Sequence, residues 1–173
     1  MKFYSGFSLR NELYLFKNYV NGSQYTACGF SYGAIKALHY AQEQLACGKR
    51  VDRVVLLSPV FFQTKDVKFK RVQLLSYKKN RDSYLTQFEE SCFFPHAKKI
   101  VEHSETTIEE LEELLEYEWS LQELEELVAK GVKLEVYLGS EDKIIDAQGA
   151  RAFFLNVATV TYIKNANHFL QTN

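Results

Sequence analysis

A serine between two glycines is the residue of this sequence best placed to act as a nucleophile. Ser31 is the centre of the pentapeptide Gly29-Phe30-Ser31-Tyr32-Gly33. An apolar run at 24–28 precedes it and a segment with helical character begins directly after it. A tight turn between a strand and a helix holds a serine hydroxyl above a parallel sheet, and flanking glycines permit a turn too tight for Cβ atoms. The pattern therefore predicts acyl-transfer chemistry at Ser31.

A serine hydroxyl needs a base that takes its proton and an acid that orients the base. His168 follows the last apolar run of the chain, and Asp142 follows the run before it. Both side chains are therefore expected beyond strand ends, where they can meet Ser31. Asp146 is the alternative acid, although capping of the next helix already explains it, and Glu141 would face the opposite way from Asp142. The other histidines have simpler explanations, within a helix or on the surface: His39, His96 and His103.

The oxyanion of an acyl-transfer intermediate needs hydrogen-bond donors. The backbone N–H of Tyr32 opens the helix after Ser31, where the helix dipole favours negative charge. The turn at 5–8 follows the first apolar run and can supply a second donor, the N–H of Phe7. We therefore predict an oxyanion hole made by Phe7 and Tyr32.

Apolar runs alternate with helical segments along the whole chain, which is typical of an α/β protein with a mainly parallel sheet. The predicted strands are 2–4, 24–28, 53–57, 133–138 and 159–163, and the predicted helices are 9–19, 32–46, 108–129 and 147–156. Gly131 and Asp146 stand where a C-terminal and an N-terminal helix cap are expected. We expect one domain, residues 1–173, with about five strands and helices on both faces of the sheet.

The segment at about 60–127 interrupts the alternation and is predicted to be a helical lid over the sheet. Its first part, the basic segment, carries seven cationic side chains: Lys65, Lys68, Lys70, Arg71, Lys78, Lys79 and Arg81. Its continuation at 105–126 is acidic and contains no lysine or arginine. Two solvated helical faces of opposite charge would explain the pattern. A docking surface for an acidic partner would also explain it.

The composition is that of an ordinary globular protein, with 46% hydrophobic and 25% charged residues and a formal net charge of −1. This charge argues against general nucleic-acid binding. Three cysteines without metal-ligand spacing favour free thiols in a reducing cytoplasm. We find no apolar stretch of membrane-spanning length and no signal-peptide pattern. We expect a cytoplasmic protein, monomeric, without membrane attachment, metal or organic cofactor.

Four motifs spread over the chain together resemble the α/β-hydrolase superfamily. They are Ser5-Gly6-Phe7, Gly29-Phe30-Ser31-Tyr32-Gly33, Gly139-Ser140-Glu141-Asp142 and Asn167-His168-Phe169. Two departures stand out: Ser5 replaces the histidine common before the oxyanion glycine, and the opening strands of the usual fold are missing. The resemblance implies a truncated α/β-hydrolase with Ser31, Asp142 and His168 as its triad.

Within that superfamily, the short chain and its GFSYG turn resemble the compact bacterial pimeloyl-ACP methyl ester esterases of biotin biosynthesis. This resemblance implies hydrolysis of the methyl ester of pimeloyl-[acyl-carrier protein], with the acidic carrier protein docked on the basic segment. Two other functions remain open here. One is a general carboxylesterase or thioesterase that uses no carrier protein, and the other is a non-catalytic module that binds an acidic partner.

Overall fold

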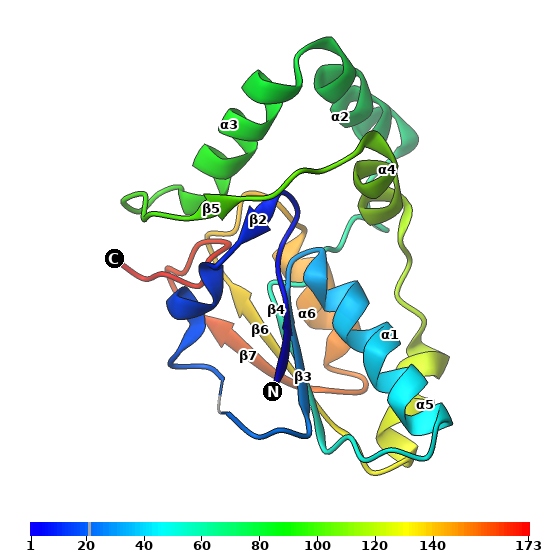
Figure 1. Ribbon diagram of the computed structural model, residues 1–173. Helices are drawn as coiled ribbons and strands as arrows, with labels where there is room; N and C mark the ends of the chain where they lie inside the picture. The colour runs from blue at the N-terminus through cyan, green and yellow to red at the C-terminus, as the bar shows by residue number, and fades with distance from the viewer. Residues whose placement is uncertain (21) are drawn as a thin grey trace.

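A five-stranded parallel sheet forms the centre of the protein (Figure 1). The computed structural model describes residues 1–20 and 22–173. The strands lie in the order β1-β3-β4-β6-β7, and each pairs in parallel with its neighbours. Their bounds are β1 Lys2–Tyr4, β3 Thr26–Phe30, β4 Arg53–Leu57, β6 Lys133–Gly139 and β7 Thr159–Ile163. The predicted α/β class with five strands is confirmed, and β3 begins two residues later than predicted.

Helices and shorter segments cover the two faces of the sheet. Alternate residues of a strand point to opposite faces, so Val54 and Leu56 belong to one apolar cluster while Val55 and Leu57 belong to the other. The first cluster includes residues of α1 (Gly33–Ala46), α5 (Leu121–Ala129) and α6 (Ala147–Phe154). The second includes residues of the 3-10 helix η1 (Glu12–Phe16), the end of α3 (Arg81–Phe93) and the C-terminal segment.

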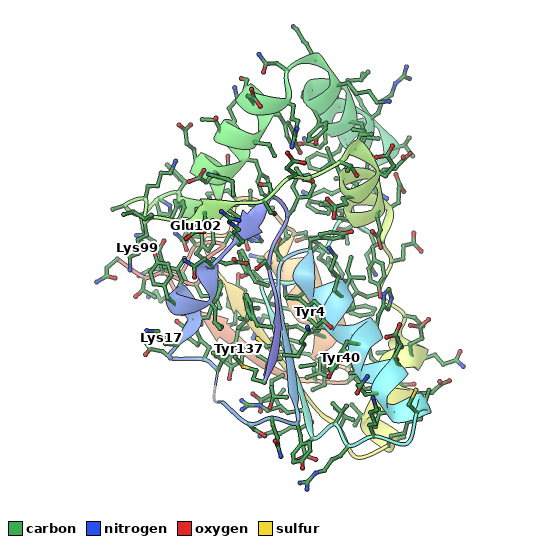
Figure 2. All side chains as sticks on the ribbon, in the orientation of Figure 1. Tyr4, Lys17, Tyr40, Lys99, Glu102 and Tyr137 are labelled. Atoms are coloured by element: carbon green, nitrogen blue, oxygen red, sulfur yellow. The ribbon has the colours of Figure 1, made fainter. Side chains whose placement is uncertain are left out.

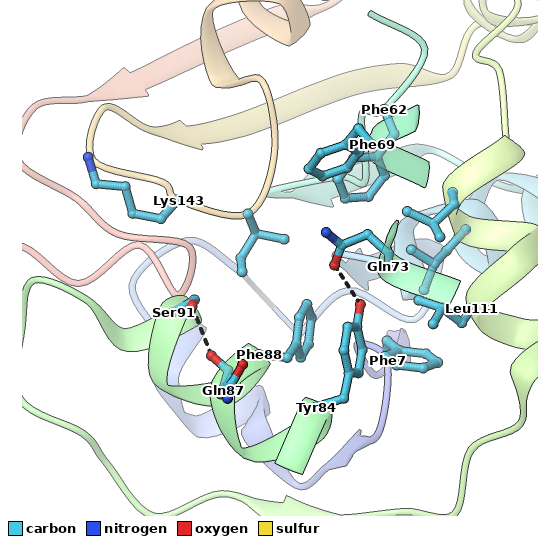
Figure 3. Close-up of a pocket in the computed structure, with 13 residues that line it drawn as sticks. Phe7, Phe62, Phe69, Gln73, Tyr84, Gln87, Phe88, Ser91, Leu111 and Lys143 are labelled. Atoms are coloured by element: carbon cyan, nitrogen blue, oxygen red, sulfur yellow. Dashed lines mark hydrogen bonds between the residues drawn. The ribbon is translucent and has the colours of Figure 1, made fainter. Parts of the chain in front are cut away.

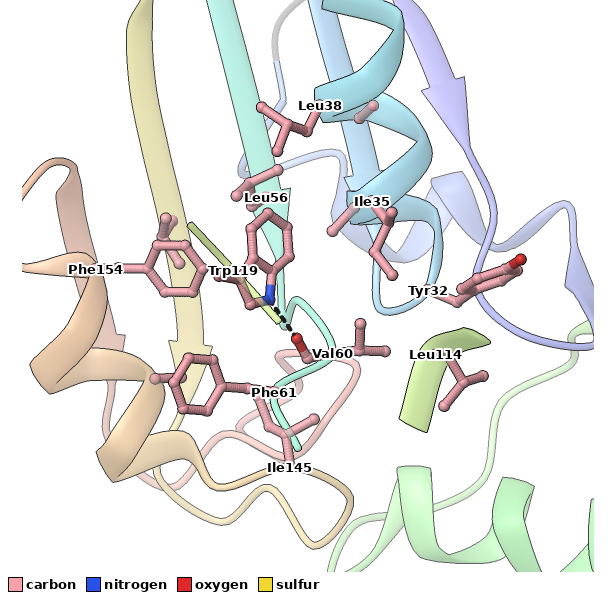
Figure 4. Packing of buried hydrophobic residues seen from close by; sticks show 14 of the residues in the cluster. Tyr32, Ile35, Leu38, Leu56, Val60, Phe61, Leu114, Trp119, Ile145 and Phe154 are labelled. Atoms are coloured by element: carbon pink, nitrogen blue, oxygen red, sulfur yellow. Dashed lines mark hydrogen bonds between the residues drawn. The ribbon is translucent and has the colours of Figure 1, made fainter. Parts of the chain in front are cut away.

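Trp119 divides the helix predicted at 108–129 into two. The chain forms α4 (Ile108–Glu116) and α5, and Ser120 caps α5 by accepting the N–H of Glu123. Between them the indole N–H of Trp119 donates to the Val60 carbonyl oxygen at 2.7 Å, and the Trp119 ring packs on Phe154 (Figure 4). A buried indole whose N–H has an acceptor contributes a large apolar area to the core. The prediction of a single helix was therefore wrong.

Three helices within the segment predicted as a lid stand together beyond the sheet, and we call these three the lid (Figure 1). They are α2 (Val67–Lys79), α3 and α4. Side chains cap the first two of these helices, since Asp66 accepts the N–H of Phe69 and Asn80 accepts the N–H of Ser83. The Lys70 ammonium lies 2.9 Å from a Glu116 carboxylate oxygen and joins α2 to α4.

The prediction of a helix at 9–19 was also wrong. Leu9 and Arg10 form β2 (Leu9–Arg10), which pairs antiparallel with β5 (Glu102–His103) from the end of the lid. Asn11 then takes a positive φ of 67°, which ends the strand before η1 begins. The partner strand lies about ninety residues away, so local periodicity could not predict it.

The end of β1 lies unusually close to the start of α1. Tyr4 and Tyr40 pack on each other where β1 and α1 meet, with ring centroids 5.9 Å apart (Figure 2). At Gly33, a Cβ atom would lie 2.1 Å from the Tyr4 carbonyl oxygen and 2.5 Å from that of Ser5. Only glycine permits this approach, which brings the turn after β1 beside Ser31.

Gly33→Ala is therefore expected to destabilise the fold. A methyl group in contact with backbone atoms forces strands and helix apart, and the free energy of unfolding should fall by about 2 kcal/mol or more. Gly22→Ala is the control, since its Cβ would meet no atom within 4 Å. Denaturant unfolding measures both variants. Equal stability of the two would contradict the close approach.

Candidate active site

Ser31 occupies a strained bend between β3 and α1. Its φ is 53°, a left-handed conformation that is uncommon for residues other than glycine. The Ser31 N–H donates to the Leu57 carbonyl oxygen at 2.9 Å, and the Ser31 carbonyl oxygen accepts the N–H of Ala34 at 3.1 Å. These bonds fix the bend against β4 and the first turn of α1. This is the strand–turn–helix geometry that presents a nucleophilic serine.

The structure brings Ser31, His168 and Asp142 into one hydrogen-bonded line. His168 Nε2 lies 3.0 Å from Ser31 Oγ, and His168 Nδ1 lies 2.6 Å from Asp142 Oδ2. The side chains of His168 and Asp142 are fully buried. A carboxylate only accepts hydrogen bonds, so Nδ1 carries the proton and Nε2 accepts the Ser31 hydroxyl. This arrangement prepares the hydroxyl for proton removal.

The loop after β6 places Asp142, not Asp146, against the imidazole. Asp142 Oδ1 accepts the N–H groups of Ile144 at 2.8 Å and Ile145 at 3.2 Å, which directs Oδ2 at His168. Asp146 caps α6 by accepting the Gly149 N–H at 2.9 Å. That hydrogen bond lowers the pKa of Asp146. The helix cap that the sequence indicated explains Asp146 fully.

Gly139 allows the loops after β6 and β7 to touch. A Cβ atom there would lie 2.4 Å from the carbonyl oxygens of both Ala166 and Asn167. The Glu141 N–H donates to the Ala166 carbonyl oxygen at 2.8 Å and links the loops further. This contact sets the separation of Asp142 and His168.

Asn167, from the motif Asn167-His168-Phe169, holds the His168 loop in place through its side-chain amide, a contact that the sequence did not predict. It is fully buried beside His168. Its amide nitrogen donates to the Phe93 carbonyl oxygen at 2.7 Å and to Gln171 Oε1 at 2.9 Å, and its amide oxygen accepts the Gln171 N–H. Asn167 thus ties the His168 loop to the end of α3.

Two backbone N–H groups near Ser31 are free. Within residues 1–20 and 22–173, the N–H groups of Phe7 and Tyr32 donate no hydrogen bond. Both residues are buried, and their rings pack edge to face with centroids 6.4 Å apart. A buried N–H without an acceptor is unfavourable unless a ligand supplies one. The sequence predicted these two N–H groups as the donors of an oxyanion hole, and that role stays a prediction.

Tyr32 also connects the bend to the lid. Its phenol donates a hydrogen bond to Glu113 of α4, and Lys36 lies over its ring. Burial is the main cause that raises the pKa of Tyr32, and the hydrogen bond to Glu113 raises it further. The phenol therefore stays neutral and keeps donating at ordinary pH.

The other three histidines lie away from the Ser31 hydroxyl. His39 packs on Tyr117, the ring of His96 lies 2.7 Å from the Asn165 carbonyl oxygen, and His103 lies 3.2 Å from Glu89. Each has a contact that explains its position.

An aromatic pocket of about 240 Å³ lies between the lid and the body (Figure 3). Phe62 stacks on Phe69 at one side, and Phe7 and Phe88 form its opposite wall. Tyr84 donates to Gln73 Oε1 at 3.1 Å inside it. Burial raises the pKa of Tyr84 to about 12, so it remains neutral. The pocket can hold an apolar chain with one polar group. Phe7 belongs to the turn after β1, and its ring forms part of the pocket wall.

The basic segment is exposed at six of its seven cationic residues. On α2, positions 68, 71, 72, 75 and 79 follow helical spacing and are all exposed. They form a face on which Val72 and Leu75 lie among basic side chains. Lys70 is the exception, because it is buried and paired with Glu116.

Within the described residues, no group of three His, Cys, Asp or Glu side chains could hold a metal ion. Cys28, Cys47 and Cys92 are free thiols. None of the described helices combines the length and the apolar character that crossing a bilayer requires.

The parallel sheet, with its helices and the loops that follow its strands, has the α/β-hydrolase fold. Solved structures of similar fold support this class. BioG from Haemophilus influenzae is 10% identical, with a TM-score of 0.58 over 97% of this chain and 87% of its own. The naproxen esterase (carboxylesterase NP) of Bacillus subtilis is 18% identical, with a TM-score of 0.55 over 85% of this chain. A serine hydrolase from a Cycloclasticus bacterium is 15% identical, with a TM-score of 0.53 over 84% of this chain.

The chain spans 54% of the length of the three Bacillus subtilis hydrolase and esterase structures that it matches. No protein-family model and no curated protein sequence matches it. The structural similarity therefore establishes the fold.

Asn167→Leu is expected to disorganise the His168 loop. It leaves the Gln171 N–H without its acceptor and removes one of the two donors to the Phe93 carbonyl oxygen, which should lower the free energy of unfolding by about 2 kcal/mol. Labelling of Ser31 by a fluorophosphonate should slow at least about tenfold, because His168 loses its orientation. Asn18→Leu, at an exposed position where the amide makes no hydrogen bond with the described residues, is the control and should change stability by less than about 1 kcal/mol. If Asn167→Leu is labelled as fast as the wild type, the hydrogen bonds of Asn167 are not needed to orient His168.

Proposed function

We propose that this protein is a serine carboxylic ester hydrolase that removes the methyl ester from pimeloyl-[acyl-carrier protein]. The line from Asp142 through His168 to Ser31 carries the proposal of ester hydrolysis. The finer substrate rests on the resemblance to the compact pimeloyl-ACP methyl ester esterases and on the basic face of α2. The structural similarity to BioG extends over 97% of this chain and 87% of BioG, which supports a compact fold of the same extent.

The first half of the proposed reaction acylates the serine. Ser31 Oγ attacks the ester carbonyl while its proton passes to His168 Nε2, and Asp142 stabilises the imidazolium that forms. The N–H groups of Phe7 and Tyr32 donate hydrogen bonds to the oxyanion, which is the acceptor that they otherwise lack. The carbon–oxygen bond to the methoxy group breaks, and His168 returns the proton to release methanol.

Hydrolysis of the acyl-enzyme repeats these steps with water. His168 takes a proton from the water, the oxygen attacks the acyl carbon, and Ser31 leaves with that proton. The product is the free ω-carboxyl of the pimeloyl chain. Burial of Ser31 and His168 keeps the local dielectric constant low, which strengthens each of these interactions.

The carrier protein would dock on α2. The exposed cations of the basic segment offer charge to an acidic protein, and Val72 and Leu75 offer apolar area between them. Lys70 is excluded from this surface by its pairing with Glu116. We place this activity in the cytoplasm, since the exposed thiol of Cys47 suits a reducing compartment.

Substitutions in the line of three residues test the chemistry. Ser31→Ala should lower kcat on a 4-nitrophenyl ester by about 10⁴-fold or more, and Asp142→Asn by about 10²- to 10⁴-fold. Asp146→Asn should stay within about threefold of the wild type, because Asp146 caps a helix. Product analysis by mass spectrometry should then find free pimeloyl-ACP and methanol from the methyl ester. An active Ser31→Ala variant would refute the mechanism.

Charge reversal tests the docking. Lys68→Glu with Arg71→Glu should raise KM for the carrier-linked ester about tenfold, since each lost surface pair contributes up to about 1 kcal/mol. Hydrolysis of a free methyl ester should not change. Lys49→Glu, after the far end of α1, is the matched control. If the double variant handles both esters like the wild type, a general carboxylesterase that needs no carrier is the better description.

A further inference from the structure

Glu12 is a buried carboxylate that the mechanism above leaves unused. It opens η1 directly after β2 and is fully buried. None of the ion pairs among the described residues includes it. Burying a carboxylate costs much more free energy than burying an apolar side chain of the same size. A group retained at this cost needs an explanation in what it contacts.

The contact is the turn that carries the predicted oxyanion donor. Glu12 Oε1 accepts the Gly6 N–H at 2.8 Å in a buried hydrogen bond. Burial raises the pKa of Glu12, and the Gly6 N–H opposes that rise. Its second oxygen, Oε2, is buried and has no hydrogen-bond partner in the described part of the chain. The Gly6 hydrogen bond is thus the clearest polar contact of this side chain.

Two anchors together determine where the Phe7 N–H points. Glu12 fixes the peptide plane between Ser5 and Gly6 through the Gly6 N–H. The Gly6 carbonyl oxygen accepts the Leu9 N–H at 3.2 Å, which fixes the next plane. In a trans peptide the N–H points away from the carbonyl of the same plane. The Phe7 N–H therefore faces away from Leu9 and stays free.

We propose that Glu12 is a positioning residue of the oxyanion hole, holding the Gly6 peptide so that the Phe7 N–H meets the oxyanion formed at Ser31. The role rests on the proposed function, because it requires acyl transfer at Ser31. It adds a fourth side chain, from a different element, to the three of the catalytic line.

Three substitutions separate positioning from packing. Glu12→Gln keeps an oxygen acceptor for the Gly6 N–H, whereas Glu12→Met keeps the side-chain length and loses the acceptor. Glu12→Asp keeps the charge but shortens the side chain by one methylene, so that the carboxylate no longer reaches the Gly6 N–H. It replaces Glu12→Met in the comparison if Glu12→Met does not fold. The measurements are kcat and KM on a 4-nitrophenyl ester, the thermal midpoint, and the Gly6 amide resonance in a ¹H–¹⁵N spectrum.

Glu12→Gln should retain kcat within about threefold and keep the Gly6 amide shift. Glu12→Met and Glu12→Asp should lower kcat by at least about tenfold with KM within about twofold, because loss of one oxyanion donor costs about 10²- to 10³-fold and a displaced donor costs less. Their Gly6 amide resonance should move upfield. A structural role alone would not produce this split between kcat and KM or the rescue by glutamine.

Wild-type kcat in Glu12→Met or Glu12→Asp, with a shifted Gly6 amide, would overturn the proposal. Equal losses in all three variants that follow the thermal midpoint would also overturn it. An inactive wild-type protein would refute the proposed function instead, and this role with it.

Discussion

A hydrogen-bonded line from Asp142 through His168 to Ser31 joins the loops that follow three parallel strands. Parallel pairing makes the line possible, because it directs the carboxyl ends of β3, β6 and β7 to one edge of the sheet. Ser31 accepts a strained φ so that its hydroxyl reaches that edge. Close backbone contacts at Gly33 and Gly139 then bring the turn after β1 and the C-terminal loop onto it. The remaining elements support this edge.

The supporting elements come from distant parts of the chain. Asn167 ties the His168 loop to the end of α3, and Tyr32 ties the bend at Ser31 to α4 through Glu113. The lid is thus attached to the line at the His168 loop and at the Ser31 bend, and its aromatic residues help to enclose a pocket (Figure 3). This arrangement couples the position of the lid to the geometry of the reacting groups.

The sequence predicted features that depend on local pattern. Apolar runs predicted the five strands closely, and the order of Ser31, Asp142 and His168 predicted which side chains would meet. Features set by distant partners escaped prediction: β2 pairs with residues near 102, Trp119 breaks a helix to reach Val60, and Lys70 turns inward to Glu116. The roles of Asn167 and Glu12 also depend on backbone groups outside their own elements. Periodicity carries no information on such contacts.

The central claim is that Ser31 becomes acylated during turnover. The most direct test is rapid quenching of the protein during hydrolysis of pimeloyl-ACP methyl ester, followed by intact-mass and peptide mass spectrometry. We expect a covalent adduct in which Ser31 is esterified to the ω-carbonyl of pimeloyl-[acyl-carrier protein], with the carrier still attached through its thioester, and no such adduct in Ser31→Ala. Turnover with no adduct, or with an adduct on another residue, would contradict it.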